Sequence, residues 1–330
     1  MTFWQDKEVL VTGAGGFIGS HLVEVLVAEG AKVHAFVRYN SRGDPGLLRF
    51  LPADVYSQVE IVAGDLRDEQ AVHDGVEGCQ FVFHLGALIS IPYSYFHPVE
   101  VAKTNFIGTL NVLMASRDLK VERLIHTSTS EVYGTAQHVP ISEAHPLQGQ
   151  SPYSASKIGA DKLAESFYCS YGLPVVTVRP FNTYGPRQSA RAVIPTIITQ
   201  ALTKSTIRLG SLDTKRDFTF VEDTVQGFLK AAQAKGVEGG AYNLGSGEEI
   251  SIGDLANKIV QKIGKPVRIA LDAARLRPEK SEVVRLISDN RLAREALGWQ
   301  PSVSLDLGLE RTISWISSHL EHYQPDLYQF

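Results

Sequence analysis

Residues 9–19 read VLVTGAGGFIG, a short apolar run that leads directly into a glycine-rich turn. The run predicts a buried strand, and Gly13, Gly16 and Gly19 have the spacing G-x-x-G-x-x-G. In such a turn the first glycine permits a tight bend, the second lets a pyrophosphate approach the backbone, and the third lets the next helix pack closely. The N-terminus of that helix then faces the phosphates. This stretch therefore predicts a dinucleotide site at the start of an α/β fold.

Strands alternate with helices through the first half of the chain. We expect strands at 9–12, 32–37, 59–65, 81–87, 123–128 and 174–180. This alternation predicts a mostly parallel sheet with helices on both faces. After Pro180 we expect helices near 193–203, 223–234, 251–263, 289–296 and 306–320, with short strands such as 207–209 and 217–220. The fold class is α/β: a Rossmann-type doubly wound parallel sheet over 1–180, with segments returning after 215, and a smaller interleaved C-terminal α/β substrate lobe over 181–330.

The composition narrows the classes of partner. The chain has 330 residues, of which 44% are hydrophobic and 21% charged, and its net charge is −4. This balance argues against nucleic acid or a membrane surface as the main partner. We expect no spanning helix and no signal peptide, hence a cytoplasmic protein. Cys79 and Cys169 have no metal-type spacing, so we expect no metal site.

Two strand ends bear on the choice of dinucleotide. An NAD site usually has an acid after the second strand, which holds the ribose 2′-hydroxyl. Here that strand, 32–37, is followed by Arg38, which favours NADP over NAD unless Arg38 is a solvated surface charge. Asp65 ends the third strand. Its carboxylate either accepts the adenine amino group or caps the helix that follows Asp68.

Tyr153 and Lys157 lie four residues apart at the start of an expected amphipathic helix. Residues at this spacing are neighbours on one helix face. An ammonium beside a phenol lowers the phenol pKa, so that the tyrosine accepts a proton near neutral pH. Alone the pair is a weak signal, because any long helix carries such pairs on its solvated face. The stretch Thr129-Ser130-Glu131 follows the strand at 123–128, and ligands bind at that end of such sheets.

Two polar residues lie in apolar surroundings. His84, in the fourth strand, is expected to be an interior histidine with satisfied hydrogen bonds rather than a catalyst. Asn105 is a poor helix former inside an expected helix over 98–116. It is either buried and hydrogen-bonded to the sheet or exposed.

The chain carries, in this order, Gly13-x-x-Gly16-x-x-Gly19, Thr129-Ser130-Glu131 and Tyr153-x-x-x-Lys157. This combination resembles the extended short-chain dehydrogenase/reductase superfamily. The stretches RPFNTYGPR at 179–187 and RDF at 216–218 resemble its nucleotide-sugar branch.

Glu131 is similar to the acid of the 4,6-dehydratases in that branch. The Thr-Ser-Glu order is closest to GDP-mannose 4,6-dehydratase, whereas Ser130 departs from the Asp-Glu of the thymidine-sugar dehydratases. Residues 151–161 and 277–283 are similar to dehydratases of legionaminic-acid biosynthesis, which act on nucleotide-linked N-acetylglucosamine. Nucleotide-sugar 4-epimerases, which usually carry small residues after Thr129, and UDP-glucuronate decarboxylases, which share the Thr-Ser-Glu motif, stay open as alternatives.

The resemblance implies a reaction and a role for each catalytic residue. Tyr153 takes the proton of the sugar 4-hydroxyl, while Lys157 lowers the tyrosine pKa and binds the nicotinamide ribose. Thr129 binds the 4-oxygen, and Glu131 removes the C5 proton. Ser130 or Glu131 assists loss of the 6-hydroxyl as water, and hydride returns to C6.

The resemblance also implies the binding residues. The expected cofactor contacts are Gly13, Gly16, Phe17, Ile18, Gly19, Arg38, Asp65, Leu66, Leu85, Ala87, Tyr153 and Lys157. The expected contacts with a nucleotide-diphosphate sugar are Asn182, Val193, Arg216 and Arg277, although an isolated arginine is more often a surface residue. A homodimer is expected through the helices near 98–116 and 153–170.

Overall fold

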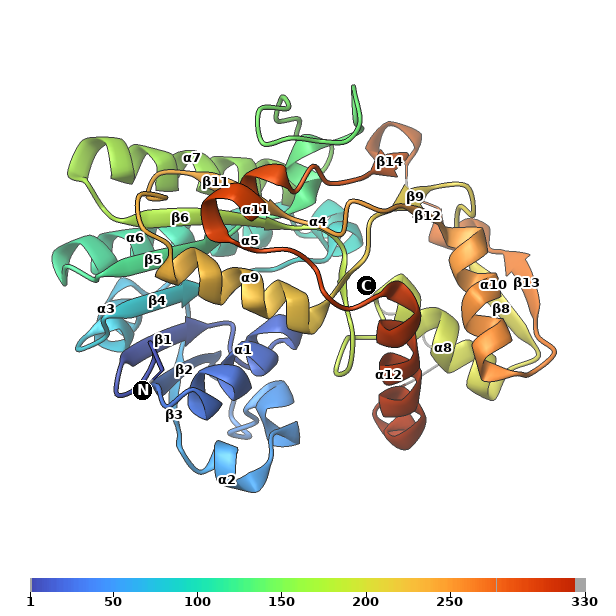
Figure 1. Ribbon diagram of the computed structural model, residues 1–330, viewed down its shortest axis with the longest axis horizontal. Helices are drawn as coiled ribbons and strands as arrows, with labels where there is room; N and C mark the ends of the chain where they lie inside the picture. Colours follow the sequence, from blue (N-terminus) through green and yellow to red (C-terminus); the bar gives the residue numbers. More distant parts are fainter. Residues whose placement is uncertain (1, 277, 324–330) are drawn as a thin grey trace.

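Seven parallel strands form the main sheet of the computed structural model, which describes residues 2–276 and 278–323 (Figure 1). The strands are β1 (Glu8–Thr12), β2 (Lys32–Arg38), β3 (Val59–Gly64), β4 (Phe81–His84), β5 (Arg123–Thr127), β6 (Val175–Pro180) and β11 (Ala241–Leu244). Their order is β11-β6-β5-β4-β1-β2-β3. This reversal of order beside β1 is typical of a Rossmann-type doubly wound sheet. The predicted fold class is therefore confirmed. Arg277 lies outside the described residues.

Helices cover both faces of this sheet. One face carries α1 (Phe17–Ala28), α9 (Val221–Gln233) and α11 (Arg291–Leu297), with the short α2 (Ala53–Tyr56) beside α1. The other face carries α3 (Glu69–Val76), α6 (Gly108–Asp118) and α7 (Pro152–Tyr171). Between β4 and α6 the chain forms α4 (Ile91–Phe96), α5 (Pro98–Ala102) and a π-helical turn at Lys103–Ile107.

The central strand shows why the sheet forms. Val9, Leu10 and Val11 are fully buried; Val9 and Val11 pack into the core under α1 and α9, and Leu10 packs into the core under α3 and α6. Successive side chains of a strand point to opposite faces, so a continuous apolar run suits a sheet covered on both sides. Each such side chain contributes about 1.5–3 kcal/mol by burial.

The glycine turn after β1 is as tight as its spacing predicts. Gly13 has a φ of +69°, and a Cβ there would lie 2.8 Å from the backbone nitrogen of Gly86. A Cβ on Gly19 would overlap the carbonyl oxygen of Gly13. Glycine is thus required for backbone conformation at Gly13 and for close packing of helix on strand at Gly19.

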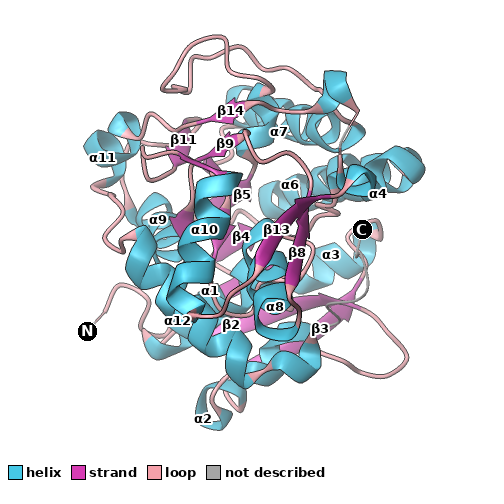
Figure 2. Ribbon diagram, turned by 90° about the vertical axis from the view of Figure 1, so that its right-hand side faces the viewer, coloured by secondary structure: helices cyan, strands magenta, loops and turns pink. Residues whose placement is uncertain are grey.

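A second lobe lies beyond the carboxyl ends of the strands (Figure 1). It contains α8 (Val193–Thr203), α10 (Ile252–Ile263) and α12 (Leu305–Ser318). Its strand groups are β8 (Thr206–Leu209) with β13 (Arg268–Leu271), β12 (Ile250–Ser251) with β9 (Lys215–Arg216) and β14 (Arg285–Leu286), and β7 (Thr183–Tyr184) with β10 (Thr219–Phe220). Figure 2 shows β8, β13 and α10 in front of the main sheet. The five predicted helices of this half are confirmed, with ends shifted by at most two residues.

Two predictions in this half differ from the structure. The expected strand at 217–220 is shortened to β10 (Thr219–Phe220). Buried Asp217 instead accepts hydrogen bonds from the backbone of Ser246, Gly247 and Ser288. The seventh strand, β11, was not predicted. It is four residues long and contains a buried asparagine, Asn243, whose amide binds the Tyr133 hydroxyl and the Ile141 carbonyl.

Within the described residues, no helix is long and apolar enough to cross a membrane. In the same part of the chain, no group of three or more His, Cys, Asp or Glu side chains is placed to hold a metal ion.

Candidate active site

The start of helix α7 places Tyr153 and Lys157 on a buried face. The Ser151 hydroxyl accepts a hydrogen bond from the Ser154 backbone at 3.1 Å, and the Ser154 hydroxyl accepts one from the Ser151 backbone at 2.9 Å. This capping box, with Pro152 in the first turn, begins the helix at a defined residue. Tyr153 is 6% exposed and Lys157 3%. A pair on a solvated face is therefore excluded.

The Thr-Ser-Glu stretch meets this helix at the end of β5. Thr129 caps the 3₁₀ turn Ser130–Tyr133, and its hydroxyl accepts a hydrogen bond from the Glu131 backbone at 3.2 Å. Tyr153 is hydrogen-bonded to the Thr129 side chain. The structure thus brings Thr129, Glu131 and Tyr153 together.

The pKa values of the pair follow from burial. Burial raises the pKa of Tyr153 above its usual value, although the Thr129 hydrogen bond lowers it. The Lys157 ammonium donates to the Thr127 carbonyl at 2.6 Å, and burial lowers the pKa of Lys157 to about 8. The predicted direction for the tyrosine pKa is therefore wrong for this structure. Burial of the phenol, together with the nearby Glu131 and Asp161, outweighs the Thr129 hydrogen bond.

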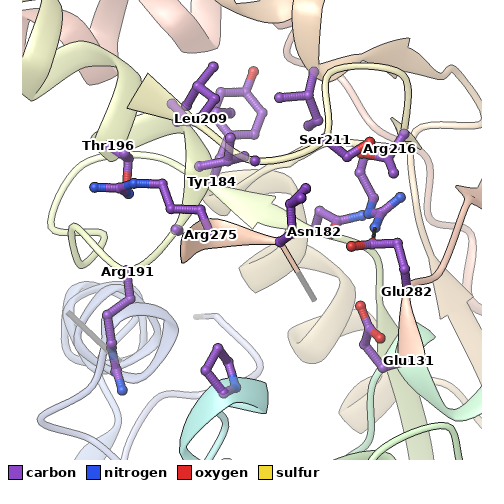
Figure 3. A pocket seen from close by; sticks show the side chains of 18 of the residues that line it. Glu131, Asn182, Tyr184, Arg191, Thr196, Leu209, Ser211, Arg216, Arg275 and Glu282 are labelled. Carbon is purple, nitrogen blue, oxygen red and sulfur yellow. Dashed lines mark hydrogen bonds and ion pairs between the residues drawn. The ribbon is translucent and has the colours of Figure 1, made fainter. Parts of the chain in front are cut away.

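A cavity of about 570 Å³ lies between the carboxyl edge of the sheet and the second lobe (Figure 3). Of the residues predicted to act on substrate, Glu131, Asn182, Val193 and Arg216 line it. Tyr153 packs instead against Ile91 and Val101, next to this wall. Glu131 is thus the predicted catalytic side chain that reaches the cavity.

The cavity wall carries more positive than negative side chains. Arg191, Arg216 and Arg275 line it together with Glu131 and Glu282. Arg216 donates to the Glu282 carboxylate at 3.2 Å, and Figure 3 shows this pair on the same side as Glu131. Guanidinium groups bind diphosphates through paired hydrogen bonds, so this wall suits a diphosphate.

Sequence reasoning did not single out Arg191, Arg275 or Glu282. Glu282 belongs to residues 277–283, which resemble the legionaminic-acid dehydratases, and that resemblance could have pointed to it. The two arginines carry no motif, and only the folded chain shows that 191 and 275 face one cavity.

The predicted cofactor residues lie along neighbouring strand ends. Gly13, Gly16, Phe17, Ile18 and Gly19 form the β1–α1 turn, Asp65 and Leu66 follow β3, and Leu85 and Ala87 follow β4. Arg38 ends β2; its side chain is 66% exposed and lies 3.8 Å from the Glu100 carboxylate. Asp65 binds the Arg67 guanidinium at 2.6 and 2.9 Å, which lowers the pKa of Asp65 to about 2. The helix cap is Asp68, which accepts from the backbone of Gln70 and Ala71.

Both polar interior residues have hydrogen-bond partners. His84 is bonded to the hydroxyls of Thr12 and Thr109, and burial lowers its pKa, so it is neutral. The interior role predicted for His84 is confirmed. Asn105 is buried, and its amide binds the backbone of Leu88 and the hydroxyl of Ser156 on α7. Asn105 thereby joins the chain after β4 to the helix that carries Tyr153.

A family model for GDP-mannose 4,6 dehydratase matches residues 10–312. The chain belongs to this family. It is therefore an extended short-chain dehydrogenase/reductase and an enzyme of the nucleotide-sugar dehydratase and epimerase group.

Members of the group with similar sequences carry both kinds of name. UDP-glucose 4-epimerase of Mycolicibacterium smegmatis is 34% identical over 93% of this chain and 97% of its own length. Human dTDP-D-glucose 4,6-dehydratase is 30% identical over 96% of this chain and 92% of its own. The two sequence identities, 34% and 30%, differ too little to assign either activity to this chain.

Solved structures of the group show the same division. DesIV, a dTDP-glucose 4,6-dehydratase from Streptomyces venezuelae solved with NAD bound, superposes with a TM-score of 0.86 at 31% identity over 96% of this chain and 99% of its own. The epimerase Mth375 from Methanothermobacter thermautotrophicus superposes with a TM-score of 0.89 at 30% identity over 97% and 94%.

The lowered pKa of Lys157 predicts a pH-dependent stability. Below pH 8 the lysine is charged in both the folded and the unfolded chain, so burial of its charge lowers the free energy of unfolding by the full amount. Between its folded pKa of about 8 and the ordinary value of 10.5, the folded chain releases the proton first, so stability rises with pH. Relative to a Lys157→Met variant, the wild type should gain up to about 1.4 kcal/mol per pH unit above pH 8. Urea unfolding of both proteins at several pH values measures this; a constant difference would show an ordinary lysine.

Proposed function

We propose that the protein is an NAD(P)-dependent nucleotide-sugar 4,6-dehydratase, which converts a nucleotide-diphosphate hexose into the 4-keto-6-deoxy sugar. The observation that carries the proposal is the position of Glu131. Its carboxylate lines the cavity, while its backbone is tied to Thr129, which is itself bonded to Tyr153. The proposed base for the C5 proton, Glu131, and the proposed base for the 4-hydroxyl proton, Tyr153, thus lie beside Thr129.

The β1–α1 turn fits the pyrophosphate of a nicotinamide dinucleotide. Helix α1 begins at Gly16, where no side chain of the described residues caps it, so its first amides suit a phosphate. Gly13, Gly16, Phe17, Ile18 and Gly19 would hold the pyrophosphate, with Leu66, Leu85 and Ala87 beside the rings and Asp65 near the adenine. When bound, the dinucleotide supplies a hydride acceptor at C4 and a hydride donor at C6. Arg38 favours NADP, although DesIV was solved with NAD.

The first step removes hydrogen from C4. Tyr153 takes the proton of the 4-hydroxyl, and Thr129 binds the same oxygen. A buried phenol loses its proton only beside positive charge, and Lys157 is charged below its pKa of about 8. Lys157 also binds the nicotinamide ribose in this proposal.

The second step removes water. The new 4-ketone acidifies the C5 hydrogen, and Glu131 takes that proton as general base. The C6–oxygen bond then breaks, and the 6-hydroxyl leaves as water with a proton from Glu131 or from its neighbour Ser130. Hydride returns to C6, and C5 gains a proton in place of the one that Tyr153 took from the 4-hydroxyl. The sugar thus loses one water, and the dinucleotide ends as it began.

The diphosphate of the substrate lies against the arginines of the cavity. Arg216, Asn182 and Val193 are the proposed contacts that the structure describes, and Arg277 lies outside the described residues. Arg191 and Arg275 add charge to the same wall. The cavity therefore suits a nucleotide-linked sugar rather than a free hexose.

A homodimer through α5, α6 and α7 belongs to the same proposal. Apolar side chains are exposed along these helices and the turn between them, at Val99, Ile107, Tyr168 and Tyr171. Exposed apolar side chains on α5, the turn after it and α7 support association of two copies of the chain.

A 4-epimerase is the second candidate, because the relative from M. smegmatis has that name. An epimerase needs no base at C5, and a UDP-glucuronate decarboxylase loses carbon dioxide instead of water. The product mass after incubation with a UDP- or GDP-linked hexose separates all three.

Glu131→Gln should retain oxidation at C4 and strongly slow water loss. The amide cannot take the C5 proton, so we expect dehydration to slow by about 10²–10⁴-fold while reduced nicotinamide still forms in a single turnover. Absorbance and product mass measure the two steps. The control is Glu282→Gln, which removes another carboxylate of the cavity; it should change the KM but still yield the dehydrated product. Water loss at the wild-type rate in Glu131→Gln would remove this residue from the mechanism.

Arg38→Ala should weaken NADPH binding by about tenfold and leave NADH binding unchanged, because only NADPH has a 2′-phosphate for the guanidinium to bind. Fluorescence titration with each dinucleotide measures the two affinities. Arg42→Ala, on the same loop, is the matched control and should change neither. Equal losses for both dinucleotides would contradict a role for Arg38 in choosing NADP.

A further inference from the structure

Asp161 is a buried carboxylate one helical turn beyond Lys157 on α7. It is 5% exposed. Residues four apart on a helix have Cβ atoms about 5–6 Å apart, so the carboxylate and the ammonium lie on the same buried face. The proposed reaction assigns Asp161 no step, and a buried charge needs partners to persist.

The hydrogen-bond partners of Asp161 come from two strands, β5 and β6. Its carboxylate accepts from the Ser128 hydroxyl at 2.9 Å and is bonded to the His126 ring at 3.1 Å, both at the end of β5. Arg179, on β6, donates to it at 3.0 and 3.2 Å. Each of these groups is itself buried.

The bond to Ser128 joins the two catalytic elements. Ser128 lies between Thr127, whose carbonyl accepts the Lys157 ammonium, and Thr129, which is bonded to Tyr153. One carboxylate on α7 therefore holds the strand end that contacts both members of the tyrosine–lysine pair.

The charge of Asp161 acts on Lys157 as well. Burial lowers the pKa of Lys157, and the negative charge of Asp161 opposes this. The titratable and charged groups that act on the pair are His84 from β4, His126 from β5, Glu131 from the turn after β5, and Asp161 from α7 itself. Arg179 from β6 faces Asp161, and Tyr133 from the turn after β5 is bonded to Arg179. Burial lowers the pKa of both histidines, whereas the pKa of Asp161 is lowered and that of Arg179 is raised, so Asp161 and Arg179 are the charged neighbours on this face.

We propose that Asp161 is a positioning residue, which fixes the end of β5 against α7 and supplies the negative charge that keeps the buried Lys157 ammonium in place. The proposal rests on the proposed oxidation at C4. That step is common to dehydratase, epimerase and decarboxylase, so the proposal is tested whichever product forms.

The test is the pH profile of kcat/KM for Asp161→Asn. The negative charge of Asp161 raises the pKa of both Tyr153 and Lys157, so its loss should move the whole profile to lower pH by about one to two units. Asp161→Glu should return the profile toward the wild-type position. The matched control is Asp223→Asn on α9, which removes another buried carboxylate, bonded to Ser302 and Val303 instead of to the strand end at 128–129. It should leave the profile in place.

A second readout requires no turnover. The pH at which the free energy of unfolding begins to rise should be lower in Asp161→Asn than in the wild type, because Lys157 releases its proton earlier. This result tests the role of Asp161 independently of which reaction the protein catalyses. A profile and an unfolding curve that keep their wild-type positions, with activity merely scaled down, would overturn the proposal.

If Asp161→Asn does not fold, Ser128→Ala is the test. That variant removes the hydrogen bond between Ser128 and Asp161 without removing a charge. We expect kcat to fall by about tenfold with the KM and the pH profile unchanged. A wild-type kcat in Ser128→Ala would also overturn the proposal.

Discussion

The buried contact between the Lys157 ammonium and the Thr127 carbonyl is the constraint on which the site depends. An ammonium this deep is stable only where the backbone and a nearby carboxylate compensate for lost water. The end of β5 provides the carbonyl, and α7 provides both the lysine and Asp161. The same strand end continues into Thr129 and Glu131, so the geometry that stabilises the lysine also positions the proposed bases.

Much of this arrangement could be predicted from the sequence. The apolar run before Gly13 and the spacing of Gly13, Gly16 and Gly19 predict the strand, the turn and the ligand class. Few residues other than glycine fit the positive φ at Gly13 or the close approach of the helix at Gly19. Tyr153 and Lys157 are neighbours by helical geometry alone. Their burial needs the tertiary fold, and it reverses the expected direction of the tyrosine pKa shift.

Other features could not be predicted because they depend on contacts distant in sequence. Strand β11 is held by its pairing with β6, since four residues with a buried asparagine carry little signal of their own. Asp217 interrupts an apparent strand because backbone groups near 246 and 288 reach it. Arg191 and Arg275 are 84 positions apart in the printed sequence (275 − 191) and become cavity neighbours only in the folded lobe.

The central claim is that one site oxidises C4 and then expels water between C5 and C6. The most direct test is turnover of UDP- and GDP-linked hexoses that carry deuterium at C4, followed by mass spectrometry and NMR of the product. The account predicts a product that has lost one water and holds the deuterium at C6, because the hydride taken from C4 returns there. A product of unchanged mass with deuterium still at C4 would contradict it.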